Sequence, residues 1–277
     1  MLKLMDLLTE GVNDKGNFKA VFMAGGPGSG KSFIAAQLFG IPETTSVSVS
    51  GLSVVNSDRQ FKMLLKKYGF DPTMLKDYEE EDPDLFKHLS APAKVGGSGL
   101  RDFAQALKDE ERKGYMAGKR GMIIDSTGSD FKKVKRQKEE LEKHGYDCYM
   151  VFVMTKLETA QRRNIERGEK GDRVLPANIV KKSWQATRKN LGGLKALFGS
   201  NFALVHNDKD LAPEQIEPTF RNIVKNYANK WVTAPVKNPI AIQWVKDQLK
   251  LQKVGGVKGV TQRSKGGKKR SKGIGYK

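Results

Sequence analysis

The sequence lacks residues on which several classes of protein depend. It has a single cysteine, Cys148, so no disulfide bond can form within the chain and no CxxC metal-binding motif is present. Cys148 lies in an apolar stretch, where a lone cysteine is typical of a small core residue. The three histidines lie far apart in the sequence, which excludes a histidine cluster for zinc.

Long apolar runs are also missing. A membrane-spanning helix needs about 20 consecutive apolar residues, whereas the most apolar runs, such as Tyr149–Met154, have the length of a strand. Residues Met1–Leu8 include Lys3 and Asp6 and show no cleavage site of small residues, which argues against a secretory signal. We therefore expect a cytoplasmic protein with no membrane contact, in a bacterial cell or a phage-infected host cell.

Acidic residues are outnumbered by basic ones. Lys and Arg total 50, Asp and Glu total 31, and the net charge is +19. Residues Lys253–Lys277 hold nine of the cations, seven glycines and no acid. A segment so poor in large apolar side chains buries too little surface to fold, so we expect a flexible basic tail after a domain of residues 1–252. The tail is either a solubilising segment or an electrostatic contact for nucleic acid or another polyanion.

Short apolar runs alternate with helical patterns through most of the chain. The runs predict five strands, at Phe18–Ala24, Leu52–Val55, Met122–Ile124, Tyr149–Met154 and Phe202–Val205. A long helical insert is expected over about residues 59–120, and its acidic run Glu79–Asp82 is interpreted as a solvated loop. The alternation predicts an α/β fold with a five-stranded parallel sheet flanked by helices.

The strongest motif is a glycine-rich loop between the first strand and a predicted helix at Lys31–Phe39. Every fixed position of the phosphate-loop pattern G-x-x-x-x-G-K-[ST] is present, in the order Gly25, Gly26, Pro27, Gly28, Ser29, Gly30, Lys31 and Ser32. Glycines let backbone N–H groups approach phosphates, and the helix N-terminus adds partial positive charge. Lys31 is placed to reach the β- and γ-phosphates, and the Ser32 hydroxyl to bind Mg²⁺. The motif predicts a P-loop fold that binds ATP and Mg²⁺.

Other motifs distinguish among P-loop proteins. The strand that ends at Asp125 is followed by Ser126, so the glutamate that activates water in motor ATPases is absent, and the Asn-Lys-x-Asp guanine motif of GTPases does not occur. A phosphotransferase instead needs a carboxylate for the acceptor hydroxyl. Asp58 and Asp125 each follow a predicted strand, at the sheet edge where ligands bind. The alternative is that either aspartate caps the following helix.

Cations for the transferring phosphoryl group are found in Ala160–Pro176, which we interpret as a lid. Arg163 and Arg167 are four residues apart on one helical face, and Arg173 follows a glycine-rich turn. Arginines on a lid can close over ATP and stabilise charge in the transition state. The alternative is a solvated helix face, which is the usual meaning of charges at this spacing.

The end of the last predicted strand offers a further candidate for nucleotide contact. His206 could contact adenine beside Asn207, and the alternative is a histidine that is only hydrogen-bonded. The tryptophans Trp184, Trp231 and Trp244 fall in helical segments, where we expect them to pack against neighbouring elements.

Taken in order, these motifs resemble the zeta toxin family of P-loop kinases and, more loosely, the polynucleotide-kinase-like kinases. The order is the phosphate loop, a strand ending at Asp58, the helical insert, a strand ending in Asp-Ser-Thr-Gly at 125–128, the arginine lid and a last strand ending in His206-Asn207. The resemblance covers about Phe18–Asp208. It implies a P-loop kinase that uses ATP and Mg²⁺ to phosphorylate a hydroxyl of a nucleotide-activated sugar, UDP-N-acetylglucosamine in known members.

The resemblance also implies roles for the residues at matching positions. Asp58 is implied as the base that takes the proton of the acceptor hydroxyl. Lys31, Arg163 and Arg173 are implied to hold the phosphates. Ser32 and Asp125 are implied to hold Mg²⁺, directly or through water. Arg167 of the lid and Asn207 at the strand end are further candidates for nucleotide binding.

Two features depart from the family pattern. Asp125-Ser126-Thr127 stands where the toxin members have Glu-Gly-Thr, which leaves the acceptor sugar open. The basic tail is not a family feature, and the lysine-rich, single-cysteine layout looks like that of kinases from large tailed bacteriophages. Three functions follow as hypotheses: a small-molecule kinase of zeta-toxin type, a 5′-polynucleotide kinase, and a non-catalytic ATP-binding, virion-associated protein. The sequence does not identify an antitoxin partner.

Overall fold

A five-stranded parallel sheet forms the centre of the molecule. The computed structural model describes residues 14–42, 47–211 and 213–263, with side chains described as far as Leu251. The strands are β1 (Lys19–Ala24), β2 (Ser53–Val55), β3 (Met122–Asp125), β4 (Asp147–Met154) and β5 (Phe202–His206). The predicted α/β fold with five parallel strands is therefore confirmed.

The strand β1 is central, in the order β2-β3-β1-β4-β5. In this register Phe22 pairs with Ile124 of β3 and Met150 of β4. All residues of β1 are buried, which explains its unbroken apolar run, since a parallel strand is covered on both faces. The order places the carboxyl ends of β1 and β3 side by side, so the phosphate loop and Asp125 meet at one edge of the sheet.

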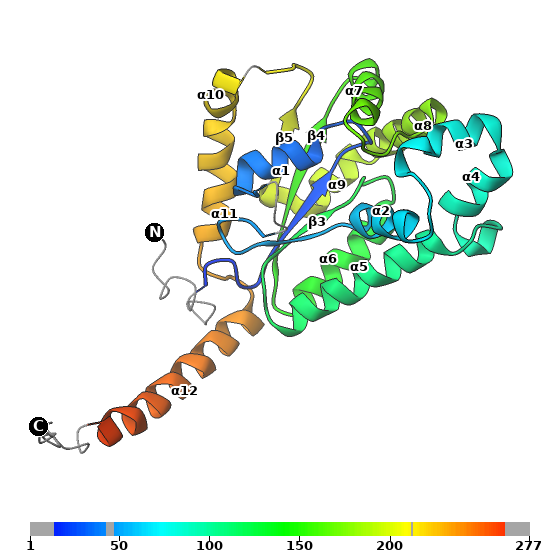
Figure 1. Cartoon of the computed structure of the whole chain (residues 1–277). Helices are drawn as coiled ribbons and strands as arrows, with labels where there is room; N and C mark the ends of the chain where they lie inside the picture. The colour runs from blue at the N-terminus through cyan, green and yellow to red at the C-terminus, as the bar shows by residue number, and fades with distance from the viewer. Residues whose placement is uncertain (1–13, 43–46, 212, 264–277) are drawn as a thin grey trace, which may run out of the picture.

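Helices cover both faces of the sheet and extend beyond it on one side (Figure 1). They are α1 (Lys31–Phe39), α2 (Ser57–Lys67), α3 (Leu75–Glu81), α4 (Pro83–Ser90), α5 (Leu100–Ala117), α6 (Phe131–Lys143), α7 (Leu157–Glu169), α8 (Ala177–Lys189), α9 (Leu191–Phe198), α10 (Pro213–Ile223), α11 (Lys230–Thr233) and α12 (Pro239–Arg263). A π-helical segment, Val224–Asn229, joins α10 to α11. Among the described residues, no helix combines the length and the apolar composition needed to cross a membrane.

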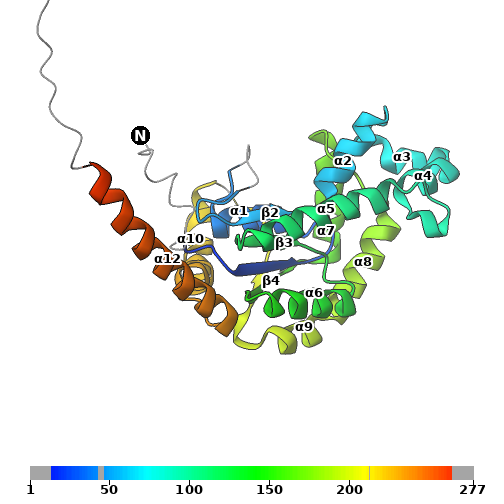
Figure 2. The same ribbon diagram turned by 90° about the horizontal axis from the view of Figure 1, so that it is seen from below.

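Two apolar layers hold the helices to the sheet. Figure 2 shows α6 and α9 on one face, where they pack on Phe22, and α1 with α10 on the other, where they pack on Val21. The predicted packing of the tryptophans is confirmed: Trp231 stacks on Tyr149, with ring centroids 4.9 Å apart, and Trp244 packs edge-on against Phe18. The burial of Cys148 in β4 is likewise confirmed.

A buried ion pair ties the start of the sheet to the C-terminal helix. Lys19 Nζ donates to Asp147 Oδ2 at 2.9 Å, and the two side chains are 1% and 9% exposed. Asp147 also accepts the backbone N–H groups of Lys237 and Asn238, directly before α12. Every oxygen of this buried carboxylate thus has a donor, which is the condition under which such a charge is tolerated.

The helical insert has a small core of its own. The side chains of Phe61 and Leu65 on α2 meet Leu89 on α4 and Ala104 on α5. The interpretation of Glu79–Asp82 as a loop is wrong, because the run covers the end of α3, at Glu81, and the N-cap of α4, at Asp82. Asp82 accepts the backbone N–H of Leu85 as the N-cap of α4, with Pro83 at the first helical position.

The ends of the chain are described only in part. The short helix expected within Met1–Leu8 lies outside the described residues. The helix α12 continues to Arg263, so the helical backbone overlaps the first part of the predicted tail. Residues 264–277, the remainder of that tail, lie outside the described residues.

Candidate active site

The phosphate loop joins β1 to α1 at the carboxyl edge of the sheet. Gly28 has φ of 73°, and a Cβ there would lie 2.0 Å from the carbonyl oxygen of Ala160. Gly30, directly before α1, has φ of 84°, and its Cβ would lie 2.3 Å from the Asn207 amide nitrogen. Both positions require glycine, because the left-handed backbone and the close neighbour leave no room for a side chain.

The loops after β4 and β5 support the phosphate loop. The Asn207 amide donates to the carbonyl oxygen of Ser29 at 2.9 Å, and the Thr155 hydroxyl donates to the same oxygen at 3.2 Å. Trp184 on α8 packs against Gly26 and donates its indole N–H to the Thr155 carbonyl at 2.7 Å. Asn207 is buried and engaged with the loop itself, so its direct contact with a nucleotide stays a prediction.

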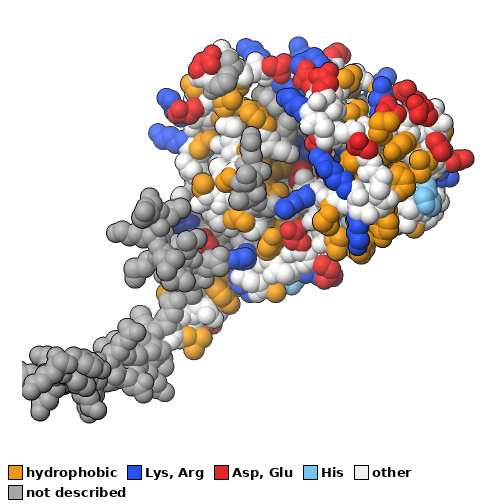
Figure 3. Space-filling model, viewed as in Figure 1, with side chains coloured by type: hydrophobic (Ala, Val, Ile, Leu, Met, Phe, Trp, Pro, Cys, Tyr) orange, Lys and Arg blue, Asp and Glu red, His pale blue; other side chains and the backbone are white. Residues whose placement is uncertain are grey.

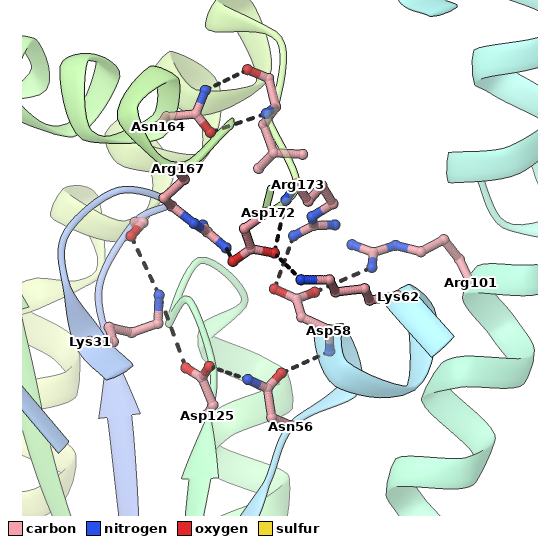
Figure 4. Close-up of polar contacts among 12 residues, drawn as sticks. Lys31, Asn56, Asp58, Lys62, Arg101, Asp125, Asn164, Arg167, Asp172 and Arg173 are labelled. Atoms are coloured by element: carbon pink, nitrogen blue, oxygen red, sulfur yellow. Dashed lines mark hydrogen bonds and ion pairs between the residues drawn. The ribbon is translucent and has the colours of Figure 1, made fainter. Parts of the chain in front are cut away.

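Lys31 and Asp125 face each other at the base of the site (Figure 4). Lys31 Nζ donates to the Gly25 carbonyl oxygen at 2.9 Å and lies 4.0 Å from Asp125 Oδ1. The other carboxylate oxygen of Asp125 accepts from the Asn56 amide at 2.9 Å. Burial raises the pKa of Asp125 above its usual range, and the charge of Lys31 opposes that rise.

One oxygen of Asp125 has the properties of a metal ligand. Oδ1 is buried and has no hydrogen-bond donor among the described residues. A hard divalent cation prefers such an oxygen, and it would also offset the desolvation that raises the carboxyl pKa. Ser32 is exposed in the first turn of α1, directly after Lys31, and its hydroxyl oxygen is also of the kind such a cation prefers. These two residues fit Mg²⁺.

Neither aspartate caps a helix through its side chain. Asn56 is the N-cap of α2, and its side-chain oxygen accepts the backbone N–H of Asp58 at 2.8 Å. The helix after β3 is capped by Asp130, which accepts the N–H of Lys133 at 2.9 Å. The alternative interpretation of Asp58 and Asp125 as caps is therefore wrong, and both carboxylates are available for chemistry.

Two arginines enclose the carboxylate of Asp58. Arg173 donates to Oδ2 at 2.9 Å and Arg101 to Oδ1 at 3.3 Å. Both guanidinium groups lie near the Phe61 ring, at 5.9 Å and 4.5 Å from its centroid. Burial raises the pKa of Asp58, but the charges of Arg173, Arg101 and Lys31 together outweigh it and hold the pKa below its usual range. Asp58 is therefore ionised at neutral pH, as a general base must be.

The segment between α7 and α8 connects to the helical insert through Asp172. This carboxylate accepts from Lys62 of α2 at 3.1 Å and from Arg167 of α7 at 3.0 Å. Burial raises the pKa of Asp172, but the backbone N–H of Arg173 and the Arg167 guanidinium lower it to about 2. The predicted lid thus lies against α2, with Arg173 and Arg167 directed inward (Figure 4).

Five residues predicted from the sequence converge in this site: Lys31, Asp58, Asp125, Arg167 and Arg173. Arg163 lies outside this group. Its guanidinium donates to the Asn207 carbonyl at 2.7 Å and to Asp210 at 2.9 Å, in the loop that follows β5. Its predicted contact with a phosphate stays a prediction.

Four polar residues of the site were not predicted: Asn56, Lys62, Arg101 and Asp172. Two of them carried a local signal. Asn56 directly precedes the helix that holds Asp58, as an N-cap does, and Lys62 follows Asp58 by one helical turn. For Arg101 and Asp172 no local sequence signal was present, because they reach the site only through the packing of α5 and of the lid against α2.

These features together define a P-loop kinase-like domain, a class that binds ATP: a parallel sheet, a phosphate loop after its central strand, and a carboxylate between cations beside the loop. The chain belongs to the family described as AAA domain (AAA_33), whose model matches residues 21–192, more than half of the chain. A search of curated proteins gives no match.

The chain is also similar to several solved structures, among them three that it matches at TM-scores below 0.5. The chain is 16% identical to a chain of the Pnkp1/Rnl/Hen1 RNA repair complex, at a TM-score of 0.46, and the match covers 65% of this chain and 47% of that one. It is 13% identical to a chain of the PezAT toxin-antitoxin system of Streptococcus pneumoniae, at a TM-score of 0.47, and that match covers 89% of this chain and 91% of the other. It is 11% identical to a putative kinase from Chloroflexus aurantiacus, at a TM-score of 0.43, and that match covers 76% of this chain and 96% of the other. The match thus spans less than half of the chain in the RNA repair complex.

Proposed function

We propose that this protein transfers the γ-phosphoryl group of ATP to a hydroxyl of a small acceptor, with a nucleotide-sugar as the acceptor class. The observation that carries the proposal is the ionised Asp58 carboxylate beside the phosphate-loop lysine, between Arg173 of the lid and Arg101 of the insert. A structural ATP site would not require a base poised between cations from two separate elements.

The residues divide the reaction between them. Asp58 takes the proton of the acceptor hydroxyl as its oxygen attacks the γ-phosphorus, and the bond from that phosphorus to the β–γ bridging oxygen breaks, releasing ADP. Lys31 exchanges its contact with the Gly25 carbonyl for the β- and γ-phosphates. Arg173 and Arg167 stabilise the charge on the transferring group. Ser32 and Asp125 would hold Mg²⁺, which would supply positive charge to the phosphates.

The cations beside Asp58 also bear on the acceptor. Once Arg173 engages ATP, Arg101 remains at 3.3 Å from Asp58, and Lys62 extends from the same face of α2. A phosphate group near the accepting hydroxyl would pair with them. This favours an acceptor that carries phosphate, which nucleotide-sugars do. A 5′-hydroxyl polynucleotide is the second candidate, and the net charge of +19 favours it.

The test is phosphotransfer by the purified chain from γ-labelled ATP. We expect a labelled product with UDP-sugars, and none with 5′-hydroxyl oligonucleotides run in parallel. Label on the oligonucleotide alone would contradict the nucleotide-sugar and support the polynucleotide kinase. Tight Mg·ATP binding by calorimetry with no transfer to any acceptor would contradict the kinase and support a non-catalytic ATP-binding protein.

A further inference from the structure

One long stretch of the chain contains cations and no acid. From Arg173 to Asn207 the sequence has no Asp or Glu, and this stretch includes α8 and α9. Its exposed cations, which we call the α8 basic face, are Lys181, Lys182, Arg188 and Lys189 on α8 and Lys195 on α9. The helix α8 leads directly into α9, and the two helices are in contact.

The orientation of α8 follows from its burial pattern. Val180 and Thr187 are buried and Trp184 is half-buried, a spacing that marks the inner side of a helix. The cations at 181, 182, 188 and 189 occupy the opposite side, with exposed Gln185 between them. Positions 181 and 188 are two turns apart, so the cations form a line roughly 10 Å long at 1.5 Å per residue.

The lysines of this face have no acidic partner among the described residues. Within the described part of the chain, no ion pair to a carboxylate is found for Lys181, Lys182, Lys189 or Lys195. Several cations of other helices do have such a partner, such as Lys113 with Glu110 at 2.6 Å. On the face in Figure 3, basic and acidic side chains are interspersed. The acid that contacts α8 is Glu79 of α3, which lies 3.5 Å from the Asn178 amide in the first turn. The lysines of the α8 basic face make no ion pair with it, so the face keeps a positive potential.

We propose that the α8 basic face binds the phosphate backbone of double-stranded nucleic acid, without reading its sequence. A duplex presents one negative charge per about 1.7 Å of axis, so a line of this length faces several phosphates. Four of the five cations are lysines, which act as point charges rather than as readers of base edges. None of the exposed large apolar side chains lies on α8 or α9, so the face offers neither the anchors of a protein interface nor the stacking platforms of a single-strand site.

The test measures binding of the full chain to a fluorescein-labelled 20-base-pair DNA duplex by polarisation, across a series of KCl concentrations. The face variant combines Lys181→Gln, Lys182→Gln, Lys189→Gln and Lys195→Gln. Arg188 is left in place because its guanidinium lies over the Trp184 ring, at 4.8 Å from the centroid. The control variant removes the same charge from cations that have carboxylate partners, through Lys76→Gln, Lys113→Gln, Arg221→Gln and Lys250→Gln.

At 100 mM KCl we expect the face variant to bind the duplex roughly 10²-fold more weakly than the wild type. The slope of log K against log salt should fall in magnitude by about 3, because each lost phosphate contact lowers that slope by about 0.9. The control should keep most of its affinity, and thermal unfolding should match in all three proteins. Unchanged binding by the face variant, or an equal loss in the control, would overturn the proposal. So would tighter, lysine-dependent binding of polyglutamate or of the single strand. Because the readout is binding, its result is independent of phosphotransfer.

Discussion

Replacing Asp58 with asparagine should separate proton abstraction from nucleotide binding. The carboxylate contacts Arg173 and Arg101, whereas Lys31 and Asp125 lie on the phosphate-loop side of the site. Asparagine has the same shape but cannot accept the acceptor proton. We therefore expect the turnover number to fall by about 10²-fold or more, the scale for a positioned base, while Mg·ATP affinity stays close to that of the wild type.

The same change should lower stability by a moderate amount. The Arg173 side chain is 9% exposed and that of Asp58 is 46% exposed. The pair thus lies between exposed ion pairs, worth about 0–1 kcal/mol, and buried ones, where loss of one partner costs about 3–5 kcal/mol. Solvent screening at Asp58 and the retained amide acceptor place the expected loss at about 1–2 kcal/mol in the free energy of unfolding, measured in urea.

A matched control keeps the stability effect from being mistaken for chemistry. Asp130→Ala removes the N-cap of α6 and should cost about 1 kcal/mol without touching the site. Turnover is measured with labelled ATP, and ATP affinity by calorimetry. If Asp58→Asn turns over like the Asp130→Ala control, Asp58 is not the base. Loss of Mg·ATP binding in Asp58→Asn, with normal binding in Asp125→Asn, would mean that the two carboxylates have exchanged roles.

Three further outcomes are expected. Asp125→Asn should weaken the Mg²⁺ dependence of ATP binding, because it removes charge from the candidate metal ligand; unchanged Mg²⁺ dependence in calorimetry would refute that role. Asp147→Ala should lower the free energy of unfolding in urea by about 3–5 kcal/mol, because it leaves the ammonium of Lys19 buried without its partner; a loss below about 1 kcal/mol would contradict this. The pKa values of Asp58 and Asp172 lie below the unfolded value, so the stabilisation from each is complete above about pH 4 and is lost as pH falls through the folded pKa, which is about 2 for Asp172. Urea unfolding at pH 7, 4 and 3 should show this decline, and Asp172→Asn should reduce it.

The fold was largely predictable because its signals are local. The helix α1 begins and ends as predicted, since glycines flank it on both sides, and the buried β1 is an unbroken apolar run. The helices α3 and α4 were missed because their acidic residues were interpreted as solvated loop. The cap formed by Asp82 and Pro83 was nevertheless present in the sequence.

The site was predictable where chemistry follows directly from a motif. Lys31, Asp58 and Asp125 lie in or beside the ends of adjacent parallel strands, and topology alone brings such ends together. Arg101 lies on α5 and reaches the site through packing within the insert, which no spacing in the sequence encodes. Asn207 shows a different limit: its position at a strand end was correctly recognised, but its amide contacts the loop through Ser29.

The most direct test of the account is the transfer of labelled γ-phosphate by the wild type and by Lys31→Ala, measured with the same acceptor at saturating ATP. No other side chain of the loop supplies a fixed positive charge to the β- and γ-phosphates. The account predicts a labelled acceptor with the wild type and loss of transfer with Lys31→Ala, while the thermal unfolding of the two proteins stays similar. Transfer by Lys31→Ala at the rate of the wild type would contradict the assignment of this loop as the catalytic phosphate site.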